Sequence, residues 1–350
     1  MDMIKVLTEA IEKDATDVYI IAGLPLTMKI NGKHVRGEEG MLMPDDCKTL
    51  ISQIYDIASR NEGRGPMVDD DFSFAINQGG RFRVNVFMQR GSFAAVVRVI
   101  QFGLPVAAEI GVTEDILDFA NMKNGLVLVT GAAGSGKSTT LACIIDKINR
   151  EKEKHIITLE DPIEFIYRHD KSIVTQREID NDVESFQVAM RSVLRESTDV
   201  VLLGEMRDKE TMEVAISAAE IGQLILSTLH TMGAANTVDR IIDSFPPNQQ
   251  QQIRTQLALT LKGVISQQLV PDVNGNLIPV FEIMKTNIAI SNMIRDGRIH
   301  QINSALLSDP DMSTMDESLL KLVESGKITV DTAYEYGTNP NWIQRKSESK

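Results

Sequence analysis

The chain has 350 residues, 43% of them hydrophobic, which is enough for a sizeable core and indicates two or three domains. Its 49 acidic and 36 basic residues give a formal net charge of −13. A protein that tracks phosphate backbones needs a net basic face, so this charge balance argues against nucleic acid as the main partner.

Cysteine usage and the N-terminus narrow the class of protein further. The two cysteines, Cys47 and Cys143, stand far apart and in no metal-ligand spacing, so we expect small buried side chains in a reducing compartment, not a zinc site. Residues 1–17 are amphipathic and acidic, unlike a signal peptide. No apolar run approaches the ~20 residues of a membrane span. We therefore expect a cytoplasmic protein that can dock on a membrane protein.

Residues 1–100 are predicted to form an α+β module. In its first helix Ile4, Leu7 and Ile11 would line one face. The pair Asn31-Gly32 is a strong signal for a hairpin turn. The further elements expected are strands at 18–23 and 26–30, a helix near 45–57, and strands at 71–76, 81–89 and 92–100.

Arginines are expected on one face of the last two strands of this module. Because strand side chains alternate, burial of every second residue from Phe82 to Met88 turns Arg81 and Arg83 to the other face. If Arg90-Gly91 is the hairpin turn, Arg83 lies opposite Arg98. Like charges in that position destabilise the sheet unless an anion, such as a phosphate held by arginine forks, lies between them. Two solvated arginines that splay apart are the alternative.

The second half of the chain has a different pattern. Residues 101–112 lack periodicity and contain glycine, proline and small residues, so we predict an interdomain linker there. From residue 113 continuous apolar strands alternate with helical segments, as in a parallel sheet covered on both faces. These strands are expected at 125–130, 155–160, 199–205 and 223–230. From about residue 271 to residue 350 the chain is predicted to be mostly helical.

Residues 131–139 read GAAGSGKST and fit the phosphate-loop pattern G-x-x-x-x-G-K-[ST]. An apolar strand precedes them and an amphipathic helix follows, which is the context that the motif needs. The glycines let backbone N–H groups close around phosphates at the positive end of the helix. Lys137 is expected to reach the β- and γ-phosphates and Ser138 to contact Mg²⁺. The residues expected to bind nucleotide in this loop are Gly131, Gly134, Ser135, Gly136, Lys137, Ser138 and Thr139.

Polar residues end the other predicted strands of the second half. Glu160 and Asp161 would face the ligand crevice and orient or deprotonate water near a γ-phosphate, although an acidic turn ended by Pro162 is the alternative. Glu205 follows an apolar strand, which is the form of a Walker B acid. His230 would sense the γ-phosphate or hydrogen-bond the catalytic carboxylate, with a satisfied strand-end histidine as the alternative.

Four segments, GAAGSGKSTT, ITLEDPIEF, DVVLLGEMRD and GQLILSTLHTMGAANTVDRIID, resemble the Walker A, Asp box, Walker B and His box of the type II/IV secretion ATPase superfamily. Within it, TDVYIIAGLPLTMKINGK, RFRVNVF, IVTQRE, GVISQQL and IRDGRIHQI make the chain similar to the type IV pilus retraction ATPases over about residues 1–335. The resemblance implies an α/β protein: a PAS-like N-terminal domain at 1–100 and a RecA-like ATPase domain at 113–350 with helices at its C-terminal end.

The resemblance also implies roles for individual residues. Glu160 would activate water, Glu205 would be the Walker B acid that holds Mg²⁺ with Ser138, and His230 would monitor the γ-phosphate. Arginine fingers would be Arg83 and Arg98, together with Arg81. The family further implies ATP hydrolysis coupled to mechanical work and a homohexamer. That ring would lie at the cytoplasmic face of the inner membrane on a pilus platform protein, with a paralogous ATPase as a further partner and no nucleic acid.

Three alternatives stay open from the sequence. An extension or secretion ATPase of the same superfamily is one, because Ser291 in AISNMIRD replaces an arginine of a motif associated with retraction. Those proteins usually carry a four-cysteine metal insert, which a chain with two cysteines lacks. The second alternative, a RecA-like nucleic-acid translocase, is opposed by the negative charge. The third is a regulatory subunit with weak catalytic activity, which an ATPase assay on the protein alone would reveal.

Overall fold

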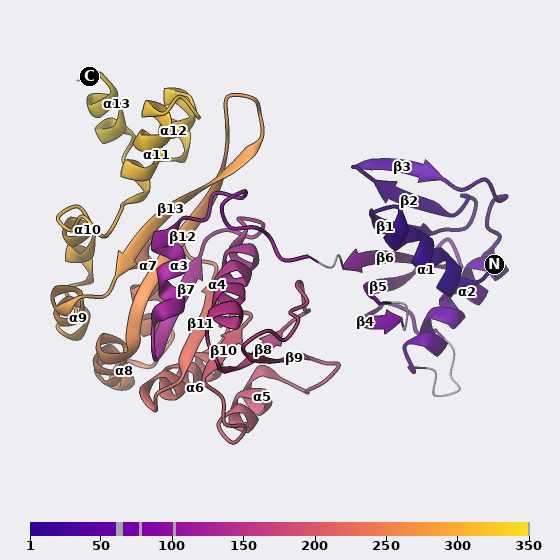
Figure 1. Ribbon diagram of the computed structural model, residues 1–350, viewed down its shortest axis with the longest axis horizontal. Helices are drawn as coiled ribbons and strands as arrows, with labels where there is room; N and C mark the ends of the chain where they lie inside the picture. Colours follow the sequence, from indigo (N-terminus) through magenta and orange to yellow (C-terminus); the bar gives the residue numbers. More distant parts are fainter. Residues whose placement is uncertain (61–65, 77–78, 101–102, 349–350) are drawn as a thin grey trace. The chain divides into compact units, whose positions relative to one another are not determined.

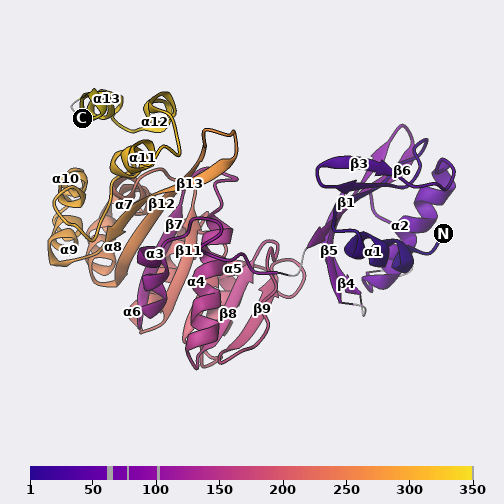
Figure 2. The same ribbon diagram turned by 45° about the horizontal axis from the view of Figure 1, so that its top comes forward.

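The computed structural model describes residues 1–60, 66–76, 79–100 and 103–348. The chain forms two compact units, one built on Met1–Gly103 and one built on Leu104–Ile163 and Tyr167–Lys350 (Figures 1 and 2). No helix in the described ranges is both long and apolar enough to cross a bilayer.

The first unit is an antiparallel sheet of strand order β3-β2-β1-β6-β5-β4 with two helices (Figure 1). Its described elements are α1 (Met3–Glu12), β1 (Ala15–Ile20), β2 (Thr27–Ile30), β3 (Lys33–Arg36), α2 (Pro44–Ile57), β4 (Asp70–Ile76), β5 (Gly80–Gln89) and β6 (Ser92–Ile100). The helices and one face of the sheet enclose a core that contains Cys47. The predicted α+β elements are therefore present.

Both predicted hairpin turns of this unit are confirmed. Asn31 and Gly32 have φ of 50° and 75°, and Arg90 and Gly91 have φ of 48° and 79°. Two consecutive positive φ angles are typical of the type I′ turn, which matches the twist of the flanking strands. The second turn sets the register of β5 and β6 and places Arg83 directly opposite Arg98, as the sequence predicted.

Two predicted core positions are wrong. Ile4 is 38% exposed, because α1 buries Met3, Val6 and Ala10 together with the predicted Leu7. A spacing of three to four residues fits both faces, and the apolar stripe is centred one position earlier than expected. Met88 is 39% exposed because it lies next to the β5–β6 turn, at the edge of the core.

The second unit is a seven-stranded sheet of order β13-β12-β7-β11-β10-β8-β9. Its strands are β7 (Gly125–Thr130), β8 (His155–Glu160), β9 (Ile173–Glu178), β10 (Val200–Leu203), β11 (Leu224–Leu229), β12 (Leu261–Pro271) and β13 (Leu277–Lys285). All neighbours are parallel except β12 and β13. The four predicted core strands correspond to β7, β8, β10 and β11, so the parallel sheet is confirmed.

The prediction that the chain is mostly helical from about residue 271 is wrong in its first part. Strand β13 pairs with β12 from Gly263–Lys285 to Pro271–Leu277, and the first helix after it begins at Ile288. The turn between them contains Asn274-Gly275, a hairpin signal that the sequence carried. Strand β9, in the segment IVTQRE, was also not predicted.

Helices cover both faces of this sheet. Leu126 and Leu128 of β7 belong to a core shared with α5–α9, and the intervening Val127 and Val129 are fully buried on the opposite face. Helix α4 packs against β7 and β11 (Figure 2). The helical elements are α3 (Glu114–Leu117), η1 (Asp118–Asn121), α4 (Lys137–Glu151), α5 (Phe186–Val193), α6 (Lys209–Glu220), α7 (Ala234–Asp243), α8 (Pro247–Thr260), α9 (Ile288–Arg295), η2 (Ile299–Gln301), α10 (Ile302–Leu306), α11 (Met315–Glu324), α12 (Val330–Tyr336) and α13 (Pro340–Glu348).

The stretch predicted as a linker divides differently. Residues 101 and 102 lie outside the described residues, and the boundary between the units falls at Gly103–Leu104. Residues 104–112 belong to the second unit: Val112 is 5% exposed, and Cys143 Sγ donates to the Pro105 carbonyl at 3.6 Å. Their small residues form turns on the surface of this unit, so the lack of periodicity does not by itself indicate a free connection.

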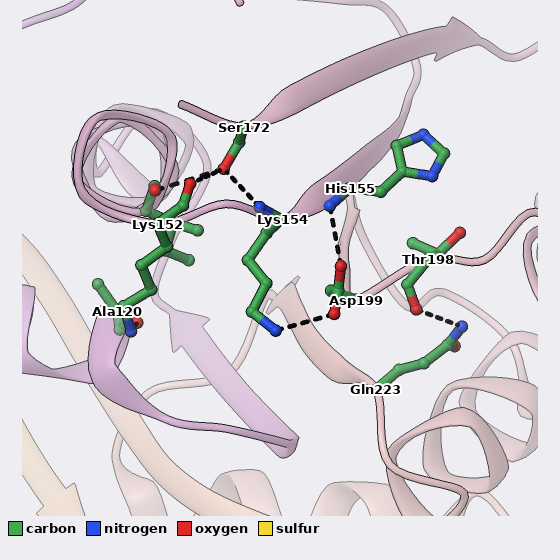
Figure 3. Close-up of polar contacts among 9 residues, drawn as sticks. Ala120, Lys152, Lys154, His155, Ser172, Thr198, Asp199 and Gln223 are labelled. Carbon is green, nitrogen blue, oxygen red and sulfur yellow. Dashed lines mark hydrogen bonds and ion pairs between the residues drawn. The ribbon is translucent and has the colours of Figure 1, made fainter. Parts of the chain in front are cut away.

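A polar cluster secures the amino-terminal ends of the parallel strands (Figure 3). Lys154 Nζ forms an ion pair of 2.9 Å with Asp199, which also accepts the His155 N–H at 2.9 Å. Although burial opposes the shift, the hydrogen bonds from Lys154 and His155 lower the pKa of Asp199. Ser172 Oγ accepts the Lys154 N–H at 3.2 Å. These contacts fasten β8, β10 and the start of β9 to one another, away from the predicted phosphate loop.

A buried carboxylate connects two helices of the second unit. Glu282 of β13 is 6% exposed, and its Oε1 accepts the N–H of Ala234, the first residue of α7, at 2.7 Å. Its Oε2 accepts the N–H of Met315, the first residue of α11, at 3.3 Å. Burial nevertheless raises the pKa of this carboxyl group. Helices α11–α13 lie beside β12 and β13, where they enclose a small core of their own (Figures 1 and 2).

Candidate functional site

The phosphate loop, residues 131–139, connects the end of β7 to the start of α4. Its three glycines, Gly131, Gly134 and Gly136, have φ of 145°, 76° and 86°, a region that side chains disfavour. Gly136 caps α4, so the N–H groups of the first helical turn face the loop. Ser135 Oγ is buried and has no hydrogen-bond partner among the described residues. An acceptor-rich group such as a phosphate fits these donors.

Strand β12 forms a wall of this loop through Gln267. A Cβ atom at Gly131 would lie 2.2 Å from the Gln267 carbonyl oxygen, so only glycine fits there. Thr140 Oγ1 on α4 donates to Gln267 Oε1 at 2.7 Å, and both side chains are buried. This wall is a functional feature that the sequence analysis missed; GVISQQL was noted for its resemblance alone.

Lys137 lies inside the loop and is 8% exposed. Its Nζ donates to the carbonyl oxygens of Gly131 at 3.0 Å and Ala132 at 2.8 Å. The ammonium group is therefore held inside the loop by two of its carbonyl oxygens. A buried cation at the positive end of a helix favours anionic ligands.

Three predicted residues lie at the carboxyl ends of neighbouring strands. Glu160 ends β8, Glu205 follows β10 after Gly204, and His230 directly follows β11. Because the strands are parallel, these ends share one edge of the sheet with the phosphate loop, where ligands of open α/β sheets bind. The Gly204 N–H donates to the Leu159 carbonyl at 2.8 Å, which keeps the ends of β8 and β10 side by side.

Glu160 is 8% exposed and so lies within the edge of the sheet. Gln176 Nε2 of β9 donates to its Oε1 at 3.4 Å. A carboxylate oriented by an amide is suited to accept a proton from water. Gln176 was not predicted, although it stands in the segment IVTQRE.

Glu205 and His230 contact each other. His230 Nε2 lies 3.0 Å from Glu205 Oε2. Arg207 forms an ion pair with the same carboxylate and lies 3.8 Å from Asp161 Oδ2. The sequence analysis did not single out Arg207, although it stands two positions after Glu205. One carboxylate thus contacts two cationic or titratable side chains at the ligand edge.

The pKa of His230 is lowered from its ordinary value of 6.5. Burial is the largest cause, followed by the positive charges of Lys137 and Arg207. The charge of Lys137 thus acts on His230, which links the phosphate loop electrostatically to the end of β11. The neutral form of His230 is therefore favoured; its single N–H lies on Nε2 and donates to Glu205, and Nδ1 can accept a hydrogen bond.

The predicted arginines all lie in the first unit, on the sheet formed by β5 and β6. Arg83 forms a two-pronged ion pair with Asp71, at 2.9 and 2.7 Å, and Arg98 Nε lies 3.2 Å from Asp17. The anions expected beside these arginines are therefore supplied by carboxylates within the unit. Arg81 is partly buried and lies two residues before Arg83 in β5, on the same face of the sheet.

Known proteins are similar to this chain in sequence and in fold. The family described as type II/IV secretion system protein matches residues 2–277. The type IV pilus retraction ATPase PilT of Pseudomonas aeruginosa is 39% identical over 344 residues, which cover 97% of this chain and 99% of that protein. A twitching motility protein of Neisseria gonorrhoeae is 46% identical over 266 residues, 75% of this chain and 71% of that protein.

A solved structure is similar over almost the whole chain. The crystal structure of the pilus retraction motor PilT with bound ADP superimposes with a TM-score of 0.89 at 41% identity. The match covers 99% of both chains. It therefore extends over both units.

Proposed function

Since the chain belongs to the type II/IV secretion system protein family and is an ATPase of its pilus retraction branch, we propose that it works as a homohexameric motor on Mg·ATP. The observation that carries this mechanism is the convergence of a glycine-bounded loop, a buried Lys137, two carboxylates and a neutral histidine at one edge of a parallel sheet. This set can bind phosphates, hold a cation and activate water.

ATP binding is proposed to occur in the phosphate loop. The N–H groups of residues 131–139 and the Lys137 ammonium would compensate phosphate charge, and Ser135 Oγ would gain the partner that it lacks. The Ser138 hydroxyl and the Glu205 carboxylate are hard oxygen ligands of the kind that Mg²⁺ prefers. Mg²⁺ held there supplies charge compensation on the phosphates.

Hydrolysis is proposed to use Glu160 and His230. Glu160, held by Gln176, accepts a proton from the attacking water. His230 donates its single N–H to Glu205 at 3.0 Å, and it would detect a γ-phosphate because a phosphate oxygen would compete with Glu205 for that proton. Arg207 pairs with both Asp161 and Glu205, so it supplies a positive charge next to these residues.

The arginines are proposed to complete the site from another part of the assembly. Arg83, Arg98 and Arg81 would stabilise the charge on the transferred phosphoryl group, as arginine fingers do. A homohexameric ring brings the first unit of one subunit to the nucleotide of another. This part of the proposal comes from the family resemblance.

The motor is proposed to act at the cytoplasmic face of the inner membrane. Its ring would turn ATP-driven domain motion into movement of a pilus platform protein, and a paralogous ATPase would share the work. An extension or secretion ATPase is the alternative. The match over 99% of the length of PilT favours retraction.

The experiment that tests the direction of work is deletion of the gene followed by a count of surface pili. Hyperpiliated cells that the wild-type gene restores, and a Lys137→Ala gene does not, support retraction by ATP hydrolysis. Cells without pili would instead establish an extension role. A purified protein whose ATPase rate rises with DNA would favour a nucleic-acid translocase.

A further inference from the structure

A row of charged residues crosses the sheet of the first unit. Asp17 of β1 lies directly opposite Arg98 of β6, and Arg98 lies directly opposite Arg83 of β5. Arg83 in turn faces Ser73 of β4, with Asp71 one diagonal step away on the same strand. Directly opposite residues on one face of a sheet are close enough to interact. The row therefore places two arginines side by side with a carboxylate at each end.

The contact at the β4 end of this row fixes the guanidinium in both position and plane. Nε of Arg83 donates to Asp71 Oδ1 at 2.9 Å, and Nη2 donates to Oδ2 at 2.7 Å. A two-pronged ion pair of this kind is geometrically specific. It uses the Nε–Nη2 edge of the guanidinium and leaves Nη1 on the side away from Asp71.

The contact at the other end is anchored more deeply. Asp17 is 6% exposed, accepts from Thr16 Oγ1 at 2.9 Å through Oδ2, and pairs through Oδ1 with Arg98 Nε at 3.2 Å. The Arg98 side chain is 69% exposed, so its guanidinium extends from a buried anchor into solvent. The guanidinium groups of both arginines are thus held by carboxylates of their own sheet.

We propose that Asp71 and Asp17 are positioning residues that hold Arg83 and Arg98 in the orientation in which they bind a nucleotide phosphate. The inference rests on the proposed function, in which these arginines act on ATP. A long arginine side chain loses rotamer freedom when it binds, and a carboxylate that already holds one edge reduces that loss. Each carboxylate also compensates the repulsion between the two arginines when no phosphate is present.

The test is a double-mutant cycle on the full-length protein, with ATPase rates as the readout. Asp71→Asn keeps the shape of the side chain and removes its charge. We expect it to lower kcat/KM for ATP by about three- to tenfold. In an Arg83→Lys background, which keeps a positive charge but not the fork, the same substitution should change kcat/KM by less than about twofold. Asp71→Glu should restore part of the activity.

A matched control uses another ion pair of the same unit. Lys13 and Glu9 form an exposed pair at 2.6 Å on α1, and Glu9→Gln removes a carboxylate without touching the row. This control should leave kcat/KM unchanged. Thermal unfolding of all variants separates a loss of folded protein from a loss of orientation.

Four results would overturn the inference. An equal loss from Asp71→Asn in both backgrounds means that Asp71 does not act through Arg83. A rise in kcat/KM means that the carboxylate competes with phosphate for the arginine. Full activity of Arg83→Lys and Arg83→Ala removes Arg83 from the proposed mechanism, and the inference with it. Reduced activity of the Arg83 variants with no effect of Asp71→Asn rejects the inference alone.

Discussion

Thr140 and Gln267 stand 127 positions apart, and their side chains are joined by a buried hydrogen bond of 2.7 Å. Thr140 lies in the first turn of α4, directly behind the phosphate loop, and Gln267 lies in the middle of β12. The bond fixes the start of α4 against the sheet. The phosphate loop is thereby supported by a strand that lies more than a hundred residues later in the chain.

Replacement of Gln267 by Leu should weaken ATP binding. The change leaves the Thr140 hydroxyl buried without its partner, which costs about 1–3 kcal/mol. Because the start of α4 is then no longer fixed beside the phosphate loop, part of this cost falls on ATP binding, and we expect the Kd for ATP to rise by about tenfold, which corresponds to about 1.4 kcal/mol. Fluorescent-nucleotide titration measures it. Gln268→Leu is the matched control, because the Gln268 side chain donates to the Tyr336 carbonyl at 3.3 Å and should leave the Kd unchanged.

Gly131→Ala should abolish nucleotide binding, whereas Gly134→Ala should be mild. The new Cβ at residue 131 would lie 2.2 Å from the Gln267 carbonyl oxygen, a backbone atom that cannot rotate away. At residue 134 no atom lies within 4 Å, and the cost is that of a positive φ, about 1 kcal/mol. Nucleotide titration and thermal unfolding compare the two. Equal effects would show that the loop moves away from β12.

Lys137→Ala and Glu160→Gln should separate binding from hydrolysis. Loss of the Lys137 ammonium removes charge compensation and should abolish nearly all turnover together with tight ATP binding. Glu160→Gln keeps the size of the side chain and should leave ATP binding intact while hydrolysis falls by roughly a hundredfold or more. Single-turnover rates measure the second effect. Unchanged hydrolysis in the Glu160 variant would exclude this residue as the base.

His230 should titrate below pH 6.5 in the nucleotide-free protein. Burial and the nearby positive charges disfavour its protonated form, so the folded-state pKa is lower than the unfolded one. Stability from this residue is therefore lost as the pH falls from 6.5 through the folded-state pKa. NMR of the ring protons measures the pKa. Lys137→Met should raise it, because the charge of Lys137 is one of the causes; an unchanged value would place Lys137 outside the site of His230.

Mixed rings should test whether the site is shared between subunits. Arg83→Ala subunits lack an arginine finger, and Lys137→Ala subunits lack the loop cation. Mixing the two should restore part of the ATPase activity, because some neighbouring pairs then combine an intact loop with an intact arginine. Each variant refolded alone is the control. Confirmed mixed rings without activity at any ratio would argue for sites within single subunits.

The sequence predicted the local features of this protein well. The pair Arg90-Gly91 predicted that Arg83 lies opposite Arg98, because a two-residue turn allows only one register between the strands on either side of it. The sequence also predicted Glu160, Glu205 and His230 at one edge of the sheet. Each lies at the end of a strand that runs parallel to the strand before the phosphate loop, so all of them lie at the carboxyl edge.

Contacts between distant segments could not be predicted in the same way. The partners of the arginines, Asp71 and Asp17, come from other strands, and the pairing of β1 with β6 is not encoded by any turn. Gln267 reaches the phosphate loop only because β12 lies beside β7 in the sheet. No local sequence pattern indicates that these two strands are neighbours, so the contact of Gln267 with the phosphate loop could not be predicted.

Glu282 gives the catalytic unit a rigid link between its nucleotide edge and its C-terminal helices. One carboxylate accepts the first N–H of both α7, which begins four residues after His230, and α11. If either helix moves alone, a buried N–H loses its acceptor at a cost of about 1–3 kcal/mol. A displacement of the segment that contains His230 would therefore either carry α11 with it or break one of these two hydrogen bonds.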